Sequence, residues 1–141
     1  MNIKVLALDL ERTLIDNSLS GRPRPGLWHF LTFCNSRFGR VTVFSTVEEA
    51  DAREVLADLA DRGHVPPELL ARLEFVQWSG EHKDLAFVSD ATPAEVLLVD
   101  DDPGWVRPDQ RGQWVAIAGW DGGPDNELNR IQTHLCALTE R

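Results

Sequence analysis

An almost unbroken apolar run near the start of the chain constrains the fold more than any other feature. It extends from Ile3 to Leu10 and contains Asp9 close to its end. Because polar and apolar residues do not alternate, the run predicts a strand that is buried on both faces, as in parallel sheets. Similar runs, the second of them weaker, follow at residues 41–44, 73–78, 96–99 and 114–118.

Segments in which apolar residues recur with a helical period separate these runs. They cover residues 27–38, 48–61 and 125–139. Pro25 and Gly39 flank the first segment, and Gly63 follows the second, as is common at helix ends. Thr46 and Glu49 have the spacing of a capping box, so we expect Thr46 to cap the second helix.

Strands that alternate with helices of this size pair in parallel through right-handed crossovers. We therefore expect residues 1–141 to form one domain with a three-layer, Rossmann-like α/β fold around a mainly parallel sheet of five strands. No linker, repeat or low-complexity segment divides the chain. Ligands of such sheets bind beyond the carboxyl ends of the strands, so residues at those ends are candidates for a site.

The charge of the chain excludes some classes of function. Fourteen Lys and Arg against 23 Asp and Glu give a formal charge of −9, which argues against a non-specific binder of nucleic acid or membrane surfaces. No apolar stretch approaches the ~20 residues of a membrane span, and no basic segment precedes an apolar run at the start. We expect a cytoplasmic protein. Cys34 and Cys136 lack metal-site spacing and are expected to be small core residues.

Polar residues of a particular kind stand at the predicted strand ends. These residues are Asp9, Glu11 and Thr13 after the first strand, Ser45 and Thr46 after the second, Lys83 in the loop before the 96–99 strand, and Asp100, Asp101 and Asp102 after it. Five carboxylates at one edge would repel each other without a cation, and hard oxygen ligands suit Mg²⁺. A metal, a lysine, a hydroxyl and an attacking carboxylate together favour phosphoryl chemistry.

This ordered set resembles the four motifs of the haloacid dehalogenase (HAD) superfamily. The matching residues are Asp9-x-Glu11-x-Thr13, Ser45, Lys83 and Asp100-Asp101. More narrowly, the chain is similar to the small phosphatases of the RNA polymerase C-terminal-domain branch, also called NLI-interacting-factor-like. That similarity rests on residues 8–14, 24–27, 83–85 and 99–103 and covers nearly the whole chain.

The resemblance implies a role for each matched residue. Asp9 would be the nucleophile that forms an aspartyl-phosphate, Lys83 would neutralise charge on it, and Glu11 would stand at the acid/base position. The expected phosphoryl-binding and loop-fixing residues are Thr13, Ser45 and Thr46. Mg²⁺ would be held by Asp9, Asp100, Asp101 and residue 11, the last through its backbone carbonyl.

Glu11 departs from the superfamily pattern. Phosphatase members carry Asp-x-Asp, whose second acid protonates the leaving oxygen and then activates water. Glutamate has the same chemistry, but its extra methylene shifts the carboxyl group, and a displacement of about 1 Å can reduce a rate ~10²-fold. Two hypotheses follow: a Mg²⁺-dependent phosphatase, or a weak or inactive domain that acts in protein interaction or phosphate binding. A CheY-like receiver fits the order of the acidic residues poorly.

The spacing of the motifs leaves no room for a cap domain over the site. Only 31 residues separate Thr13 from Ser45, and a helix, a short segment at 66–72 and a strand fill the interval before Lys83. An open site favours a phosphorylated protein or a small phosphomonoester as substrate, with nucleic acid and membrane disfavoured. The polar loop 17–24 is a candidate flap, and its Arg22 and Arg24 either meet an anionic substrate or are solvated.

Two tryptophans flank the predicted site. Trp78 precedes the Lys83 loop, and Trp105 follows the acidic turn at 100–102. Both are placed either to stack on an aromatic phosphate ester or to pack at the rim of the core.

Overall fold

Five parallel strands form one sheet in the order β3-β2-β1-β4-β5. The computed structural model describes residues 1–140. The strands are β1 (Val5–Leu8), β2 (Arg40–Val43), β3 (Glu74–Phe75), β4 (Val96–Asp100) and β5 (Trp114–Ala116). The expected α/β, Rossmann-like fold class is therefore confirmed, with no separate cap among the described residues.

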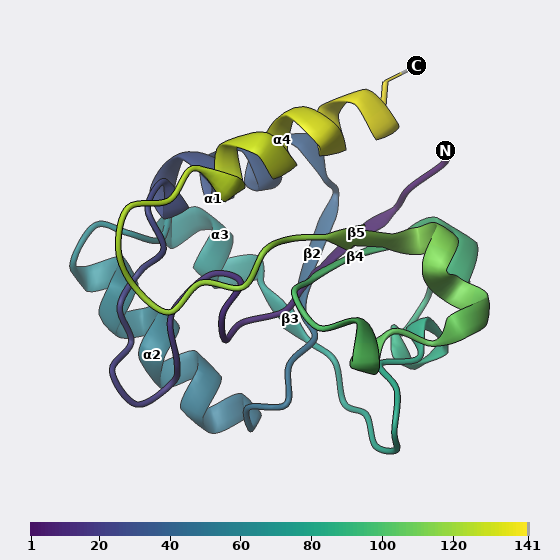
Figure 1. Ribbon diagram of the computed structural model, residues 1–141, viewed down its shortest axis with the longest axis horizontal. Coiled ribbons are helices and arrows are strands. Elements are labelled where there is room, and N and C mark those ends of the chain that lie inside the picture. Colours follow the sequence, from purple (N-terminus) through teal and green to yellow (C-terminus); the bar gives the residue numbers. More distant parts are fainter. Residues whose placement is uncertain (141) are drawn as a thin grey trace.

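All four α-helices pack on one face of this sheet. They are α1 (Leu27–Arg37), α2 (Glu49–Asp61), α3 (Pro67–Arg72) and α4 (Glu127–Leu138). Their buried residues belong to one apolar cluster; α1 contacts both α3 and α4, and α3 contacts α2. Figure 1 shows these helices along the top and left of the sheet. The α3 helix occupies the 66–72 segment, where no helical period predicted a helix.

Short 3₁₀ helices and loops cover the opposite face. They are η1 (Leu85–Phe87), η2 (Pro93–Glu95), η3 (Pro103–Trp105) and η4 (Pro108–Gln113). Residues Leu85, Val88 and Val106 pack there against the second face of the strands. The third layer of the fold is thus present, but it is built from single helical turns and connecting loops.

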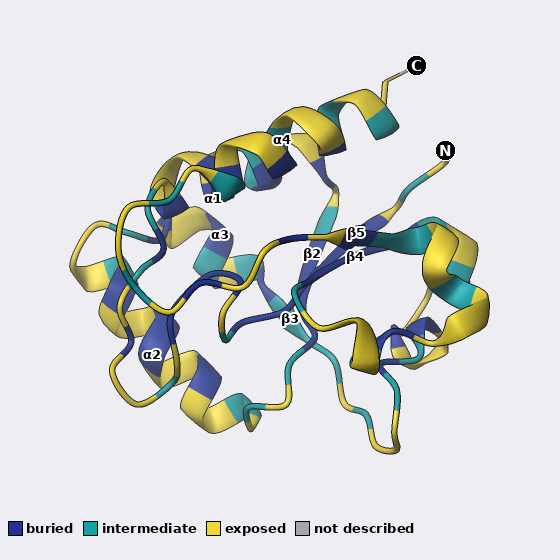
Figure 2. Ribbon diagram, in the orientation of Figure 1, coloured by how far each residue is buried: buried dark blue, intermediate teal, exposed yellow. Residues whose placement is uncertain are grey.

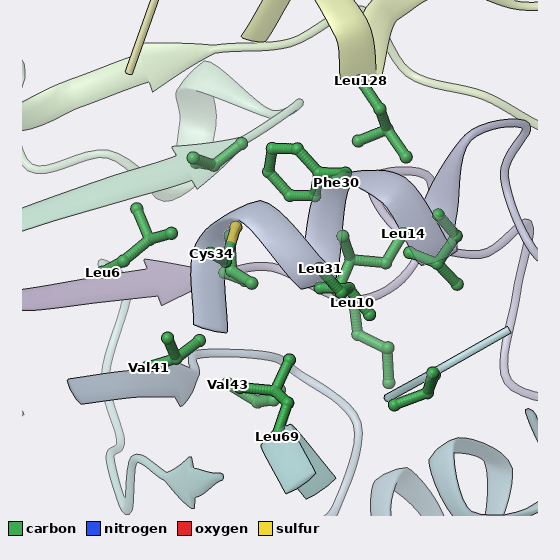
Figure 3. Close-up of a cluster of buried hydrophobic side chains, with 14 of the residues drawn as sticks. Leu6, Leu10, Leu14, Phe30, Leu31, Cys34, Val41, Val43, Leu69 and Leu128 are labelled. Atoms are coloured by element: carbon green, nitrogen blue, oxygen red, sulfur yellow. The ribbon is translucent and has the colours of Figure 1, made fainter. Parts of the chain in front are cut away.

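The two faces of the strands alternate residue by residue. Leu6 and Leu8 of β1 join the helical cluster, whereas Val5 and Ala7 join the cluster under the 3₁₀ turns, as the twofold period of a strand requires. Figure 3 shows Leu6 beside Cys34, with Phe30 and Leu128 lying above that part of the core. Figure 2 shows the central strands β1 and β4 dark blue, β3 teal, and the outer faces of the helices yellow. Burial on both faces explains the unbroken apolar run.

The two ends of α2 test the expected capping residues. Gly63 follows α2 with φ of +81°, as predicted for a glycine at a helix C-terminus. The prediction that Thr46 caps α2 is wrong, because the helix begins after Glu48 without any side-chain cap. None of the helices among residues 1–140 is long and apolar enough to span a membrane.

The strand order reverses between β1 and β4. The chain runs outward from β1 to β2 and β3 on one side and from β4 to β5 on the other. Such a reversal leaves a crevice at the carboxyl ends of the two central strands, where parallel sheets bind ligands. Asp9 directly follows β1 and Asp100 ends β4, so both lie at this crevice.

Candidate active site

A buried lysine joins the two central strand ends. The Lys83 ammonium lies 2.9 Å from Asp9 Oδ1 and 2.5 Å from Asp100 Oδ2. The Lys83 side chain is only 1% exposed, and both carboxylates are buried as well. Asp9 and Asp100, which are 91 residues apart in the sequence, thus share one cation.

The segment after β3 brings Lys83 under the sheet edge. The backbone N–H of Lys83 donates to the carbonyl of Trp105 at 2.8 Å, which ties the segment to η3. The next residue, Asp84, caps η1 by accepting from the N–H of Ala86 and also accepts from Arg107. These contacts fix the backbone on both sides of the ammonium group.

The turn after β1 orients Asp9. The carbonyl of Leu10 accepts from the N–H groups of Thr13, Leu14 and Ile15, and this folds the chain back beneath the strand end. The Thr13 hydroxyl consequently donates to Asp9 Oδ2 at 2.8 Å. Thr13 is completely buried, so its hydroxyl faces Asp9 and not the solvent side of the site.

Burial and mutual charge shift the pKa values of all three groups. Burial raises the pKa of Asp9 to about 7; the Lys83 ammonium opposes this, and the Asp100 carboxylate adds to it. Burial likewise raises the pKa of Asp100 against the effect of Lys83. Burial alone would lower the pKa of Lys83, but the two carboxylates outweigh it and raise that pKa. A further cation nearby would favour the ionised carboxylates.

Three carboxylates at this edge have the donor chemistry of a divalent-cation site. Asp9, Asp100 and Asp101 each offer one oxygen, and these oxygens all lie within 4.8 Å of one another. Hard carboxylate oxygens suit Mg²⁺, and Lys83 together with the half-exposed Arg12 leaves the three acids with one negative charge in excess. The residues present therefore fit the ion that the sequence predicts. The Glu11 side chain does not belong to this group of oxygens.

The Glu11 side chain reaches the neighbouring loop. Its Oε2 accepts from the N–H of Ser18 at 2.7 Å. Glu11 is half-buried and lines the same cavity as Asp9, Asp100 and Asp101. The extra methylene of glutamate thus permits a contact between the strand end and the loop, while the residue still borders the site.

The hydroxyls of Ser45 and Thr46 have different surroundings. The Ser45 hydroxyl accepts from the N–H of Val47 at 3.0 Å, whereas Thr46 is exposed and makes no cap contact with α2. Thr46 lines the cavity that contains Asp9, and Ser45 lines an adjoining one. Of the two hydroxyls, the exposed one of Thr46 is therefore nearer to the cavity of the acidic residues.

The two arginines of loop 17–24 have protein partners and do not face the site. Arg24 is buried, with its guanidinium 2.8 Å from Asp125 Oδ2. Arg22 donates to the Asp16 carboxylate at 2.7 Å and to the carbonyl of Asp121. The expectation that Arg24 meets an anionic substrate or is solvated is wrong, because its side chain is buried against Asp125. Arg22 pairs with the buried Asp16, but its side chain is 61% exposed, so it remains partly solvated.

Arg12 is a site residue that the sequence patterns do not single out. Its guanidinium lies 3.2 Å from Asp101 Oδ2, and it lines the same cavity as Asp9. The position between Glu11 and Thr13 is its one sequence signal, since residues within a strand-end motif lie close to the site.

Two cavities meet at the carboxyl edge of the sheet. The first, about 380 Å³, contains the acidic residues and Trp105. The second, about 530 Å³, lies between the start of α2 and the segment after β3 and includes Trp78. Thr46 borders both. The indole rings of Trp78 and Trp105 pack edge to face, with 5.7 Å between ring centroids, and Trp78 also packs on Phe44. The two indoles therefore lie between the carboxyl edge of the sheet and the hydrophobic core.

Comparison with known proteins places the chain in a family. The family model described as NLI interacting factor-like phosphatase matches residues 4–141, nearly the whole chain. No curated protein matches the sequence significantly.

Proposed function

The chain belongs to the NLI interacting factor-like phosphatase family, of the HAD type, and from this premise we propose that it hydrolyses phosphomonoesters through a phosphoryl group carried on Asp9. The observation that carries the proposal is the setting of Asp9: a buried carboxylate held by Lys83 on one oxygen and by Thr13 on the other. Two fixed hydrogen bonds orient a nucleophile before the substrate arrives.

The proposed reaction has two displacements at phosphorus. The Asp9 carboxylate attacks, the bond to the ester oxygen breaks, and that oxygen leaves with a proton from an acid. Water then attacks the same phosphorus, transfers a proton to a base, and releases orthophosphate and free Asp9. Glu11, at the rim of the cavity, is the proposed acid and base. Lys83 offsets negative charge next to the attacking group throughout.

Asp9, Asp100 and Asp101 are the proposed ligands of Mg²⁺, together with the backbone carbonyl of Glu11. The bound ion would supply positive charge beside the phosphoryl oxygens. The nearness of the three carboxylates and the raised pKa values of Asp9 and Asp100 support this assignment, because buried acids of one sign favour a cation among them.

The open edge supports a large substrate, such as a phosphorylated protein side chain. Thr46 lines both the cavity of the acidic residues and the larger one beside α2. A phosphoryl group in the first would leave the rest of its carrier above the second, where Ser45, Thr46 and Gln77 offer polar contacts. Small phosphomonoesters also fit so open a site, with less shelter from water.

Removal of the nucleophile tests the proposal. Wild type with Mg²⁺ should release phosphate from an aryl phosphate, and Asp9→Asn should lower that rate by at least about 10³-fold, since no covalent intermediate can form. Asp58→Asn, an exposed acid on α2 whose side chain is 62% accessible, is the matched control and should retain the rate. Equal, negligible rates in wild type and Asp9→Asn would contradict the enzyme assignment.

A second candidate, a phosphate-binding or protein-interaction domain without turnover, follows from one contact. The bond between Glu11 and the N–H of Ser18 competes with proton transfer by that carboxylate. Binding of orthophosphate by wild type in calorimetry, without hydrolysis or phosphoenzyme, would favour this candidate over the phosphatase.

A further inference from the structure

We propose that Arg12 is a substrate-binding residue whose guanidinium pairs with the phosphoryl oxygens; this inference rests on the proposed function. Arg12 lines the cavity of about 380 Å³ that contains Asp9, Asp100 and Asp101. Position 12 lies within residues 8–14, on which the family similarity rests, but that similarity assigns its side chain no role. Four kinds of observation on the described residues carry the assignment.

The first observation is the balance of charge in the cavity. Its charged lining consists of Asp9, Glu11, Asp100, Asp101, Asp102 and Arg12, so within residues 1–140 Arg12 is the one cation of that lining. Lys83 lies beneath, 1% exposed and bonded to two carboxylates. A phosphoryl dianion therefore approaches an acidic surface on which Arg12 alone offers exposed positive charge.

The second observation is that the Arg12 side chain is loosely held. The Arg12 side chain is 52% exposed, and its Nε atom lies 3.2 Å from Asp101 Oδ2. Its second partner is Asp121, whose carboxylate lies 3.7 Å from Nη1 and whose side chain is 84% exposed. The pair with Asp121 is solvent-exposed, and such pairs contribute little to stability, typically about 0–1 kcal/mol. The Asp101 side chain is 12% exposed, so its pair with Arg12 is open to solvent on the arginine side. The guanidinium can thus exchange these partners for a phosphoryl group, whose oxygens it matches in two parallel hydrogen bonds.

The third observation is the rigid and unusual backbone beneath that side chain. Arg12 has φ of +63°, a left-handed conformation that is uncommon for any residue with a side chain and is often retained at functional sites. Its N–H donates to the carbonyl of Ile15 at 2.7 Å, and its carbonyl accepts from the N–H of Trp120 at 2.9 Å. The Cα of Arg12 is therefore fixed at the strand end, while its guanidinium is held by the ion pairs with Asp101 and Asp121.

The fourth observation is the space left at Gly119. A Cβ atom at this position would lie 2.4 Å from Arg12 Nη2 and 2.9 Å from Asp101 Oδ2. Any other residue would displace the guanidinium, so the loop after β5 accommodates Arg12 at the cavity only because residue 119 is glycine.

Equilibrium binding of orthophosphate at saturating Mg²⁺ tests the proposal without turnover. In calorimetry, Arg12→Ala should raise the Kd for phosphate about tenfold or more, because a charge-assisted pair is lost. The Kd of Arg12→Lys for phosphate should lie between those of wild type and Arg12→Ala, since lysine keeps the charge but not the paired donors. Arg111→Ala removes an exposed arginine from η4, which precedes the opposite end of β5, and should bind as wild type does.

Arg12→Gly is a control for the possibility that Arg12→Ala loses binding because it misfolds. Glycine adopts positive φ without strain, so this variant should unfold at or above the wild-type temperature and still bind phosphate weakly. Wild-type phosphate affinity in Arg12→Gly would overturn the proposal. So would an altered Kd for Mg²⁺ with unchanged phosphate affinity at saturating Mg²⁺, because Arg12 would then act only by holding Asp101.

The outcomes separate this inference from the proposed function. If wild type binds phosphate but hydrolyses no faster than Asp9→Asn, the phosphatase assignment fails, and a loss of binding in the Arg12 variants still supports Arg12 as a phosphate ligand. If hydrolysis depends on Asp9 while the Arg12 variants bind phosphate normally, only the inference on Arg12 fails. Absence of phosphate binding by wild type would also overturn the inference on Arg12.

Discussion

The side chain of Glu11 lies between the strand end that carries Asp9 and the loop at Ser18. A shorter aspartate at this position would withdraw the carboxyl group from the Ser18 N–H, which glutamate contacts at 2.7 Å. The residue is therefore placed for two different roles, a proton donor and acceptor at the cavity or an anchor for the loop.

Two substitutions of Glu11 distinguish these roles. Glu11→Gln keeps an acceptor for the Ser18 N–H but cannot transfer a proton, so it should lower kcat for aryl phosphate about 10²–10⁴-fold if Glu11 is the acid and base. Glu11→Asp should retain more activity than Glu11→Gln. If Glu11→Gln keeps the wild-type rate and Glu11→Asp loses it, the residue anchors the loop instead.

At the scale of elements, Arg24 links three separate segments. Its buried guanidinium pairs with Asp125 before α4 and donates to the carbonyls of Arg12, Thr13 and Ala118. The turn after β1, the loop after β5 and the start of α4 therefore share one cation. The segment expected to be a flap is attached to the body of the molecule.

Removal of that cation should destabilise the fold. Arg24→Met leaves Asp125 without its partner and removes a donor from three backbone carbonyls. Loss of one member of a buried pair typically lowers the free energy of unfolding by about 3–5 kcal/mol. Urea unfolding measures the change. Arg53→Met, which removes an exposed pair with Glu49 on α2, is the control and should lower it by less than about 1 kcal/mol. A small effect of Arg24→Met would show that the segments hold together without this cation.

At the scale of the whole molecule, which has a net charge of −9, two groups of acids lie in contrasting places. One group of acids gathers at the carboxyl edge of the sheet, and another lies along the exposed face of α2, with Asp51, Glu54, Asp58 and Asp61 in water. Asp9 and Asp100 of the first group oppose folding, because these two carboxylates of like charge are buried. Stability should therefore respond to a cation that binds at that edge.

Addition of Mg²⁺ should raise the unfolding temperature by several degrees, and by more at pH 8 than at pH 5. The folded-state pKa of Asp9, about 7, lies above its ordinary value near 3.8. Without metal, stability is therefore lost as the pH rises from about 4 to about 7, where Asp9 is ionised in the unfolded chain but not in the folded protein. A bound cation requires the ionised form and restores that stability. Thermal scans with excess MgCl₂ or EDTA measure both shifts. Asp9→Asn is the control; an equal shift in this variant, or at both pH values, would contradict a site containing Asp9.

The family and the fold class follow from contiguous residues. The apolar run before Asp9, the acids after residues 96–99 and the glycine after α2 are local patterns, because strand burial, strand ends and helix ends depend on a few neighbouring residues. The same reasoning was wrong for Thr46, since the spacing of a capping box does not reveal that α2 begins after Glu48. It also missed α3, whose six residues are too few for a helical period.

The sequence by itself determined the alternating elements, the parallel sheet and the set of polar residues at its carboxyl edge. Only the tertiary structure decided that Lys83 bonds both Asp9 and Asp100, that Arg24 is buried against Asp125, 101 residues away, and that Arg12 faces the cavity. The physical reason is the sequence separation over which each feature is determined. Backbone conformation and apolar period are set within a few residues, whereas the partner of a charged side chain depends on which distant segments the packed core brings beside it.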